Sequence, residues 1–238
     1  MKLEQVAVHD GRPAGVVAVV EMPEGARPAP EAPPARRNLY RDVFKRWLDI
    51  AVVVLAAPLL VPLVGVFALL VTSDGGGPFY RQERVGRNRR IYRMWKLRSM
   101  VPDADAALAA HLAADPEARA EWEHHQKLRN DPRITPVGRF LRTYSLDELP
   151  QFWNVLTGDM SLVGPRPMMP KQEHLYPGRS YFALRPGITG PWQVSDRHAT
   201  SFAERAGFDD GYLRRVSLWT DLRLIAATVR VVLRGTGC

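Results

Sequence analysis

The segment Ile50–Val71, IAVVVLAAPLLVPLVGVFALLV, is the stretch of sequence that decides the architecture. It holds 22 residues without a charge, and as a helix it would be about 33 Å long, enough for the hydrocarbon core of a bilayer. Pro58 and Pro62 lie near its middle, where each removes a backbone hydrogen bond and bends a helix. We therefore expect a membrane helix that is broken at a proline.

Both flanks of this apolar run are basic. Arg41, Lys45 and Arg46 precede it, and a group of arginines follows it: Arg81, Arg84, Arg87, Arg89 and Arg90. Because basic residues favour the cytoplasmic side of a membrane, both ends of the run are expected on that side. A re-entrant helix, which enters the membrane, breaks and returns to the same face, places both ends there. A proline-kinked single span and a buried helix of a soluble protein are the alternatives that the sequence leaves open.

The composition indicates an anionic partner and a reducing compartment. The 238 residues have a formal charge of +8 and a pI near 10.0, which favours a nucleic acid, a membrane surface or a phosphorylated substrate. The excess is local, because 13 Lys and Arg stand against 4 Asp and Glu between Arg36 and Arg98. The single cysteine, Cys238, excludes a disulfide framework.

Three regions are expected along the chain. Residues 1–38 form a Pro/Ala-rich tail that cannot bury a core and is expected to be disordered. Residues 39–74 form the re-entrant membrane helix, and residues 75–238 form a small cytoplasmic domain that carries the candidate catalytic residues. The expected fold class is α+β and mostly helical.

Periodicity and turn residues predict the elements of the cytoplasmic domain. Residues 78–100 predict a β-hairpin around a Val-Gly-Arg-Asn turn, and residues 102–129 predict a pair of helices broken near Asp115-Pro116. Residues 136–156 are predicted to be helical, and 157–170 and 184–198 to be loops. Residues 218–233 predict an amphipathic helix, which either lies in the membrane interface or packs against the domain.

Two adjacent acids, Asp147 and Glu148, are candidate catalytic residues because they lie at a predicted helix start. Ser145 with Glu148 three residues later has the spacing of a capping box. In another register Asp147 is the N-cap and Pro150 lies at N3, where its missing N–H costs nothing. In either register the carboxylates stand at the positive end of a helix dipole. Alone, the pattern also fits two helix caps with no further role.

Two stiffly mounted arginines favour a phosphate site. Arg166 lies between prolines in the segment VGPRP, residues 163–167, and Arg185 opens the segment RPGITG, residues 185–190. A guanidinium mounted in this way loses less entropy when it grips a phosphate, which it can bind bidentately. Taken singly, each arginine also fits a surface residue that only improves solubility.

Lys96 and Arg98 add positive charge to the same pattern. With the two acids and the membrane segment, the basic residues predict a site for a phosphorylated, pyrophosphate-bearing substrate. Acids beside a phosphate would repel it unless a cation intervenes, and Mg²⁺ is the usual hard cation. Asp147 and Glu148 are the candidate ligands of that metal.

Several longer motifs occur in a fixed order. KRWLDI (45–50) is followed by the apolar run, by GPFYRQERVGRNRRIYRMWKLRSM (77–100), by SLDELPQFWNVLTGDMSLVGPRP (145–167) and by LRPGITGPWQVSDRH (184–198). In this order the motifs resemble the bacterial sugar transferases, the monotopic phosphoglycosyl transferases that start exopolysaccharide and glycan assembly. The resemblance runs from Arg41 to Arg234. The stretch 101–140 is most similar to the short undecaprenyl-phosphate galactose phosphotransferases.

The resemblance implies a re-entrant helix whose break aligns best with Pro62, with Pro58 as the alternative. It also implies that Asp147 attacks the sugar-bearing phosphorus of a UDP-hexose, expels UMP and forms an aspartyl-phosphosugar. Undecaprenyl phosphate then accepts the phosphosugar. Glu148 would bind Mg²⁺ or assist proton transfer. The phosphates would be held by Lys96, Arg98, Arg166 and Arg185.

The resemblance further implies a location and partners. The protein is expected at the cytoplasmic face of the bacterial inner membrane, with anionic lipids of the inner leaflet as partners. Galactose is the first expectation for the donor sugar and glucose the next, and a homodimer is one open assembly state. The segments 190–193 (GPWQ) and 195–198 (SDRH) depart from the usual family sequence, which bears on sugar specificity rather than on the chemistry.

Two rival functions use the same residues. Aromatic residues among the arginines of 81–98 can stack on nucleic-acid bases, yet they equally suit a hairpin on anionic lipid headgroups, and the sequence has no nucleic-acid-binding motif. No nucleic-acid partner is therefore expected. The second rival is a non-catalytic membrane scaffold of a polysaccharide assembly complex, which would not need an acid pair at a helix start.

Overall fold

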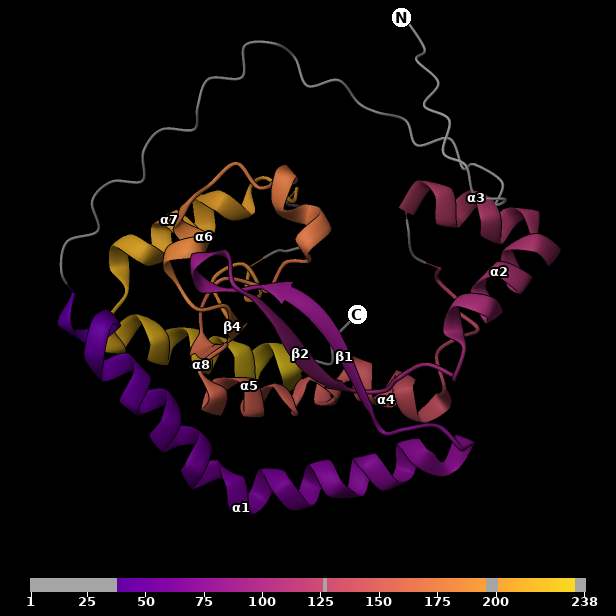
Figure 1. Ribbon diagram of the computed structural model, residues 1–238, viewed down its shortest axis with the longest axis horizontal. Coiled ribbons are helices and arrows are strands. Elements are labelled where there is room, and N and C mark those ends of the chain that lie inside the picture. The colour runs from indigo at the N-terminus through magenta and orange to yellow at the C-terminus, as the bar shows by residue number, and fades with distance from the viewer. Residues whose placement is uncertain (1–37, 126–127, 196–200, 234–238) are drawn as a thin grey trace, which may run out of the picture. The chain divides into compact units, whose positions relative to one another are not determined.

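The computed structural model describes residues 38–125, 128–195 and 201–233, and all of them belong to the same unit of the chain. The predicted N-terminal tail lies outside the described residues except for Asn38. Within the described residues the protein is α+β and mostly helical, with two sheets of two strands each (Figure 1). The predicted fold class is confirmed at this level.

The apolar run forms helix α1, Lys45–Val71, which a π-helical segment η1, Tyr40–Phe44, precedes. It is the one described helix that is long and apolar enough to cross a membrane, and it is largely uncovered by the rest of the protein. Figure 1 shows α1 bent near its middle. Pro58 and Pro62 lie inside the helix there, and each removes a backbone hydrogen bond, which accounts for the bend.

Both ends of α1 are anchored to the same part of the protein. Near the first end, Arg46 donates a 2.9 Å hydrogen bond to the carbonyl oxygen of Leu156. At the other end, Val71 packs in an apolar cluster with Leu97. The elements that carry Leu156 and Leu97 contact each other. A straight helix of 27 residues would hold its ends about 40 Å apart, so the bend is what lets both ends reach one body.

The predicted hairpin is confirmed. Strands β1, Phe79–Val85, and β2, Ile91–Leu97, pair antiparallel with Tyr80 opposite Lys96. The connection includes the short helix η3, Arg87–Arg89, in which Asn88 has φ 56°, a left-handed conformation that asparagine tolerates better than most residues. The hairpin thereby carries Lys96 on a regular strand.

A second sheet lies in segments that the sequence predicted to be loops. Strand β3, Ser161–Val163, runs parallel to β4, Gly187–Thr189. The two backbones approach so closely that a Cβ on Gly190 would lie 1.9 Å from the carbonyl oxygen of Gly164. These glycines therefore permit the contact between the two arginine-bearing segments.

Most predicted helices are present. The helical pair forms α2, Ala104–Ala114, and α3, Pro116–His125, and the last helix is α8, Leu218–Leu233, as predicted. The remaining helical segments are short or join these parts: η2 (Thr72–Asp74), η5 (Pro170–Leu175), α6 (Ser180–Ala183) and α7 (Arg205–Arg215).

The segment 136–156 is helical as predicted, but it is divided into three pieces. The structure has α4, Pro136–Thr143, then the 3-10 turn η4, Leu146–Glu148, and then α5, Gln151–Thr157. Ser145 has φ 55°, which ends the right-handed helix, and Pro150 cannot continue it because it has no N–H. The acid pair therefore lies on a separate turn between two helices.

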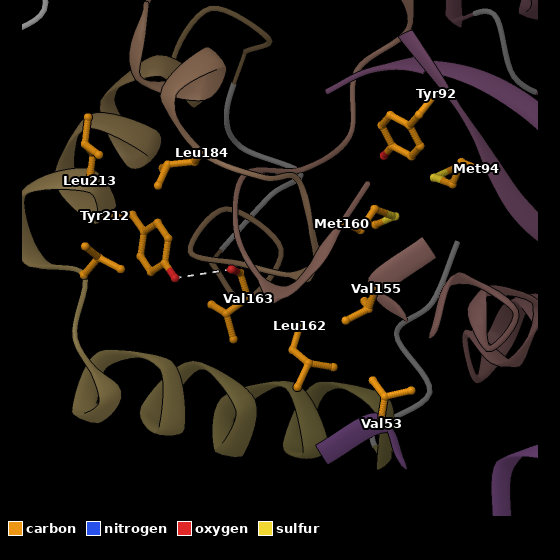
Figure 2. Packing of buried hydrophobic residues seen from close by; sticks show 11 residues of the cluster. Val53, Tyr92, Met94, Val155, Met160, Leu162, Val163, Leu184, Tyr212 and Leu213 are labelled. Atoms are coloured by element: carbon orange, nitrogen blue, oxygen red, sulfur yellow. Dashed lines mark hydrogen bonds between the residues drawn. The ribbon is translucent and has the colours of Figure 1, made fainter. Parts of the chain in front are cut away.

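The largest core cluster joins α1, the hairpin and the C-terminal half of the chain (Figure 2). Val53 of α1, Met94 of β2 and Val155 of α5 are buried in it, together with Tyr212 of α7. The hydroxyl of Tyr212 also donates a 3.3 Å hydrogen bond to the carbonyl oxygen of Val163. This packing holds together β2, which contacts the turn of the acid pair, and α5, which follows that turn in the chain.

Candidate active site

The two candidate acids lie on the turn η4. The side chain of Asp147 is buried, with the residue 7% exposed, and Glu148 is half-buried. The capping predictions are wrong. Ser145 makes no side-chain capping hydrogen bond, and Pro150 directly precedes α5 as its N-cap rather than lying at N3. Because the acids do not cap a helix by their side chains, their burial needs another explanation.

Lys96 is the cation that the fold brings to this pair. Its Nζ lies 2.7 Å from Oε1 of Glu148 and 3.5 Å from Oδ2 of Asp147. Lys96 comes from β2, 51 positions before Asp147 in the sequence, and the hairpin places it there by packing against η4. The structure therefore brings Lys96 to the acid pair, and its phosphate-binding role stays a prediction.

The two carboxyls have opposite pKa shifts. Burial raises the pKa of Asp147, and the negative charge of Glu148 adds to this effect while Lys96 opposes it. Burial would also raise the pKa of Glu148, but the charge and hydrogen bond of Lys96, with the charges of Arg166 and Arg84, hold it below its ordinary value. Two adjacent carboxyls, one with a raised pKa and one with a lowered pKa, are typical of a functional site in which the two groups have different roles.

Arg166 is within electrostatic reach of the pair, since its charge lowers the pKa of Glu148. Two further arginines, which the sequence motifs did not single out, also act electrostatically on the pair. The charge of Arg84 also acts on Glu148, and that of Arg142 acts on Asp147. Arg84 lies on β1 and Arg142 on α4, so only the tertiary fold gathers them. Their shared signal in the sequence is no more than the general excess of arginine.

Arg98 lies elsewhere. Its guanidinium donates to the carbonyl oxygens of Gly77 at 2.7 Å, Met100 at 2.9 Å and Val71 at 3.0 Å. Val71 is the last residue of α1, so Arg98 ties the end of this helix to the hairpin. Its phosphate-binding role stays a prediction.

Arg185 is also separated from the acids. Its Nε donates a 3.0 Å hydrogen bond to the carbonyl oxygen of Gly158, the residue that follows the last turn of α5. The acids precede the other end of the same helix. Arg166 follows β3 and Arg185 precedes β4, yet the charge of Arg166 acts on Glu148 while Arg185 bonds to Gly158 at the other end of α5. A phosphate-binding role for Arg185 stays a prediction.

An apolar groove of about 480 Å³ opens beside the acids. Its walls come from α1, the hairpin and α5, including Val61, Trp95 and Trp153. Leu149 and Pro150, which directly follow Glu148, also line it. An apolar chain that lay in this groove would therefore end next to the carboxylates.

A model of the bacterial sugar transferases matches residues 40–235 of this chain. The chain belongs to the bacterial sugar transferase family. The resemblance that the sequence motifs predicted is thus confirmed, and the residues matched include all the described elements from η1 to α8.

Named relatives of this sugar transferase are similar over the same region. It is 46% identical over 196 residues, 82% of this chain, to the UDP-galactose-lipid carrier transferase of Erwinia amylovora and to the undecaprenyl-phosphate galactose phosphotransferase of Salmonella typhimurium. The chain spans 41% of the length of each. It is 41% identical to the exopolysaccharide production protein ExoY of Rhizobium meliloti, over 81% of this chain and 87% of that protein.

The oxygen donors of this sugar transferase suit Mg²⁺ but do not suffice for it alone. Mg²⁺ commonly takes one or two protein carboxylates and completes its shell with substrate phosphates and water. Asp147 and Glu148 offer two adjacent carboxylates, of which Glu148 is held ionised. Among the described residues no group of three or more potential metal-ligating side chains occurs, and substrate phosphates and water would complete the shell of a bound Mg²⁺.

Proposed function

We propose that this protein is a phosphoglycosyl transferase that moves a hexose 1-phosphate from a UDP-sugar to undecaprenyl phosphate and releases UMP. The observation that carries the proposal is the acid pair. Asp147 is buried, has a raised pKa and lies close to Lys96. The pair lies beside an apolar groove that is lined in part by α1. The relatives named above, a UDP-galactose-lipid carrier transferase and an undecaprenyl-phosphate galactose phosphotransferase, support the substrate classes. UDP-galactose is the first donor to test and UDP-glucose the second.

Asp147 is the nucleophile of the proposed reaction. Its carboxylate oxygen attacks the sugar-bearing phosphorus, the bond from that phosphorus to the oxygen of UMP breaks, and UMP leaves with the bond's electrons. A phosphate oxygen of undecaprenyl phosphate then attacks the same phosphorus and releases the carboxylate of Asp147. Burial supports this role, because a carboxylate with little hydration and a raised pKa is a stronger nucleophile. The arginines nearby stabilise charge on the phosphoryl oxygens.

Glu148 holds Mg²⁺ in this proposal and does not transfer a proton. Its pKa is lowered, so it remains an anion at neutral pH and is poorly suited to act as a general acid. When bound, the metal neutralises the charge that builds up on the phosphates. Lys96 keeps the two carboxylates together before substrate arrives.

The bent helix α1 supplies the acceptor's surroundings. Leu55, Leu59 and Leu69 are each more than 70% exposed, which suits a helix that lies among lipid chains. Since both ends of α1 are anchored to one body, re-entry from the cytoplasmic face of the inner membrane fits better than a straight span. The basic residues beside both ends would contact anionic lipids of the inner leaflet. The isoprenoid of the acceptor would lie in the apolar groove, with its phosphate near Asp147.

UMP release tests the proposal. The full chain in detergent is incubated with Mg²⁺, undecaprenyl phosphate and a panel of UDP-sugars, and D147N is measured beside it. Release with one sugar that depends on Asp147 is the expected result. No release with any UDP-sugar would contradict the proposal and favour the non-catalytic scaffold of polysaccharide assembly.

A further inference from the structure

Three arginines from distant parts of the chain gather beside the loop that carries Arg166, and two of them stack on Trp192. Arg84 comes from β1, Arg166 from the loop after β3, and Arg205 from the start of α7. The guanidinium carbons of Arg166 and Arg205 lie 5.1 and 4.1 Å from the ring centroid of Trp192. Arg84 contacts the loop of Arg166 through a 3.4 Å hydrogen bond to the carbonyl oxygen of Pro167. These three residues are called the arginine cluster below.

The members of the arginine cluster repel one another. Burial, together with the charges of Arg166 and Arg84, lowers the pKa of Arg205 to about 10. Burial also lowers the pKa of Arg84, again with help from the charge of Arg166. Bringing three like charges together in partly dry surroundings costs free energy. Such a cluster is stable when an anion offsets the repulsion.

The acids near the arginine cluster already have other partners. Glu148 is bonded to Lys96 at 2.7 Å. Asp209 accepts a 2.7 Å hydrogen bond from the hydroxyl of Tyr176, and burial raises its pKa to about 7, so it is only partly ionised at neutral pH. Among the described residues neither acid forms an ion pair with the arginine cluster, and the charge of Asp209 offsets the repulsion on Arg205 only in part.

Two donors of the arginine cluster have no acceptor. The Nε atoms of Arg84 and Arg205 are buried and lack a hydrogen-bond partner among the described residues, and unsatisfied buried donors are rare enough to need an explanation. The cavity beside Arg205 and Trp192 measures only about 10 Å³, which admits at most one water molecule. A ligand must therefore meet the guanidiniums from their partly exposed side.

We propose that Arg84 and Arg205 act with Arg166 to bind the diphosphate of the nucleotide-sugar donor. This inference rests on the proposed function and adds two binding residues to it. The position fits, because the charges of Arg84 and Arg166 already act on Glu148 beside the nucleophile. The donor fits better than the phosphate of the lipid acceptor, since none of the three arginines lines the apolar groove.

Binding without turnover tests the inference. The full chain in detergent is titrated with UDP and with inorganic pyrophosphate, and R84Q and R205Q are compared with wild type by calorimetry. Each variant should bind both probes about tenfold more weakly or worse, because each loses a charge-assisted contact. R214Q is the matched control, since Arg214 is an exposed arginine on the same helix as Arg205, and it should bind as wild type does.

The apparent KM for undecaprenyl phosphate separates donor from acceptor. We expect it to change by less than about twofold in R84Q and R205Q while the KM for the UDP-sugar rises. Wild-type affinity of both variants for UDP and pyrophosphate would overturn the inference, as would a rise confined to the acceptor's KM. Failure of wild type to release UMP while pyrophosphate still binds through Arg84 and Arg205 would instead contradict the proposed function.

A conservative variant tests whether the role of Arg205 is purely structural. R205K keeps the charge and the stacking on Trp192, so it should recover part of the binding that R205Q loses. If R205K and R205Q lose binding equally and both unfold at a lower temperature, Arg205 is a packing residue and the inference is wrong for it. R84Q, in strand β1, then tests independently whether Arg84 binds the diphosphate.

Discussion

The two ends of helix α5 both have cations beside them, and the cations have different partners. Before the first end, Lys96 is shared by Asp147 and Glu148. Beyond the last turn, Arg46 and Arg185 donate to backbone carbonyl oxygens. Carbonyls at a helix C-terminus are ordinary partners of cations, whereas a lysine between two carboxylates with opposite pKa shifts is typical of chemistry. We call residues 145–150 the reactive end and residues 155–158 the anchoring end.

The comparison shows that local sequence does not reveal what an arginine does. Arg166 and Arg185 lie in similar Gly- and Pro-rich segments that pair as parallel strands. Arg166 lies within electrostatic reach of the reactive end, and Arg185 bonds to the anchoring end. Substitutions at the two ends should therefore affect different properties of the protein.

The largest effect is expected from D147N at the reactive end. An asparagine amide is a poor nucleophile, so turnover should fall by about a thousandfold or more. UMP release measured under saturating substrates checks this. D159N is the matched control, because Asp159 lies just past the anchoring end, and it should retain most of the activity. Comparable losses in D147N and D159N would remove the distinction between the two ends.

E148Q should have the next largest effect. It keeps the shape of the side chain but removes the charge that is proposed to hold Mg²⁺, so turnover should fall about tenfold or more. The half-saturating Mg²⁺ concentration should rise in parallel, as measured by a metal titration of UMP release. An unchanged Mg²⁺ requirement would show that Glu148 is not a metal ligand.

R185Q at the anchoring end should lower stability more than chemistry. It removes a hydrogen bond from a charged donor to Gly158, which is worth about 1–3 kcal/mol. Thermal unfolding in detergent should show the loss, while the KM for the UDP-sugar stays close to that of wild type. R179Q, at an exposed arginine, should change neither property. A raised donor KM with unchanged stability would support the phosphate-binding role that the sequence resemblance implied for Arg185.

The smallest effect is a shift of the pH profile. Asp147 must be ionised to attack, so activity should fall as the pH drops through its pKa, which burial raises above the ordinary 3.8. The charge of Arg142 lowers that pKa, so R142Q should move the acidic limb to higher pH. R139Q, an exposed position on the same helix, should leave the limb in place. A limb that moved to lower pH in R142Q would contradict the assignment of this titration to Asp147.

The sequence predicted correctly the helices and turns whose form depends on residues close together in the chain. The apolar run with Pro58 and Pro62, the hairpin turn with Asn88 and the break before Pro116 all depend on residues within a few positions of one another. The final helix, Leu218–Leu233, was predicted from its periodicity.

The rest depends on contacts between distant residues. The turn of the acids depends on Ser145 in a left-handed conformation, and a capping-box spacing predicts a helix there instead. The parallel pairing of β3 with β4 requires Gly164 to meet Gly190, which no single segment shows. Arg84 and Arg205 could not be told from other arginines by spacing, because only the fold brings them to Pro167 and Trp192 beside Arg166.

The most direct test of the account is to trap the intermediate on the reactive end. The full chain is incubated with UDP-galactose or UDP-glucose and Mg²⁺ in the absence of undecaprenyl phosphate, and the digested protein is analysed by mass spectrometry. The account predicts a phosphohexose on the peptide that contains Asp147 in wild type and none in D147N. A phosphohexose on another residue, or undiminished UMP release by D147N, would contradict it.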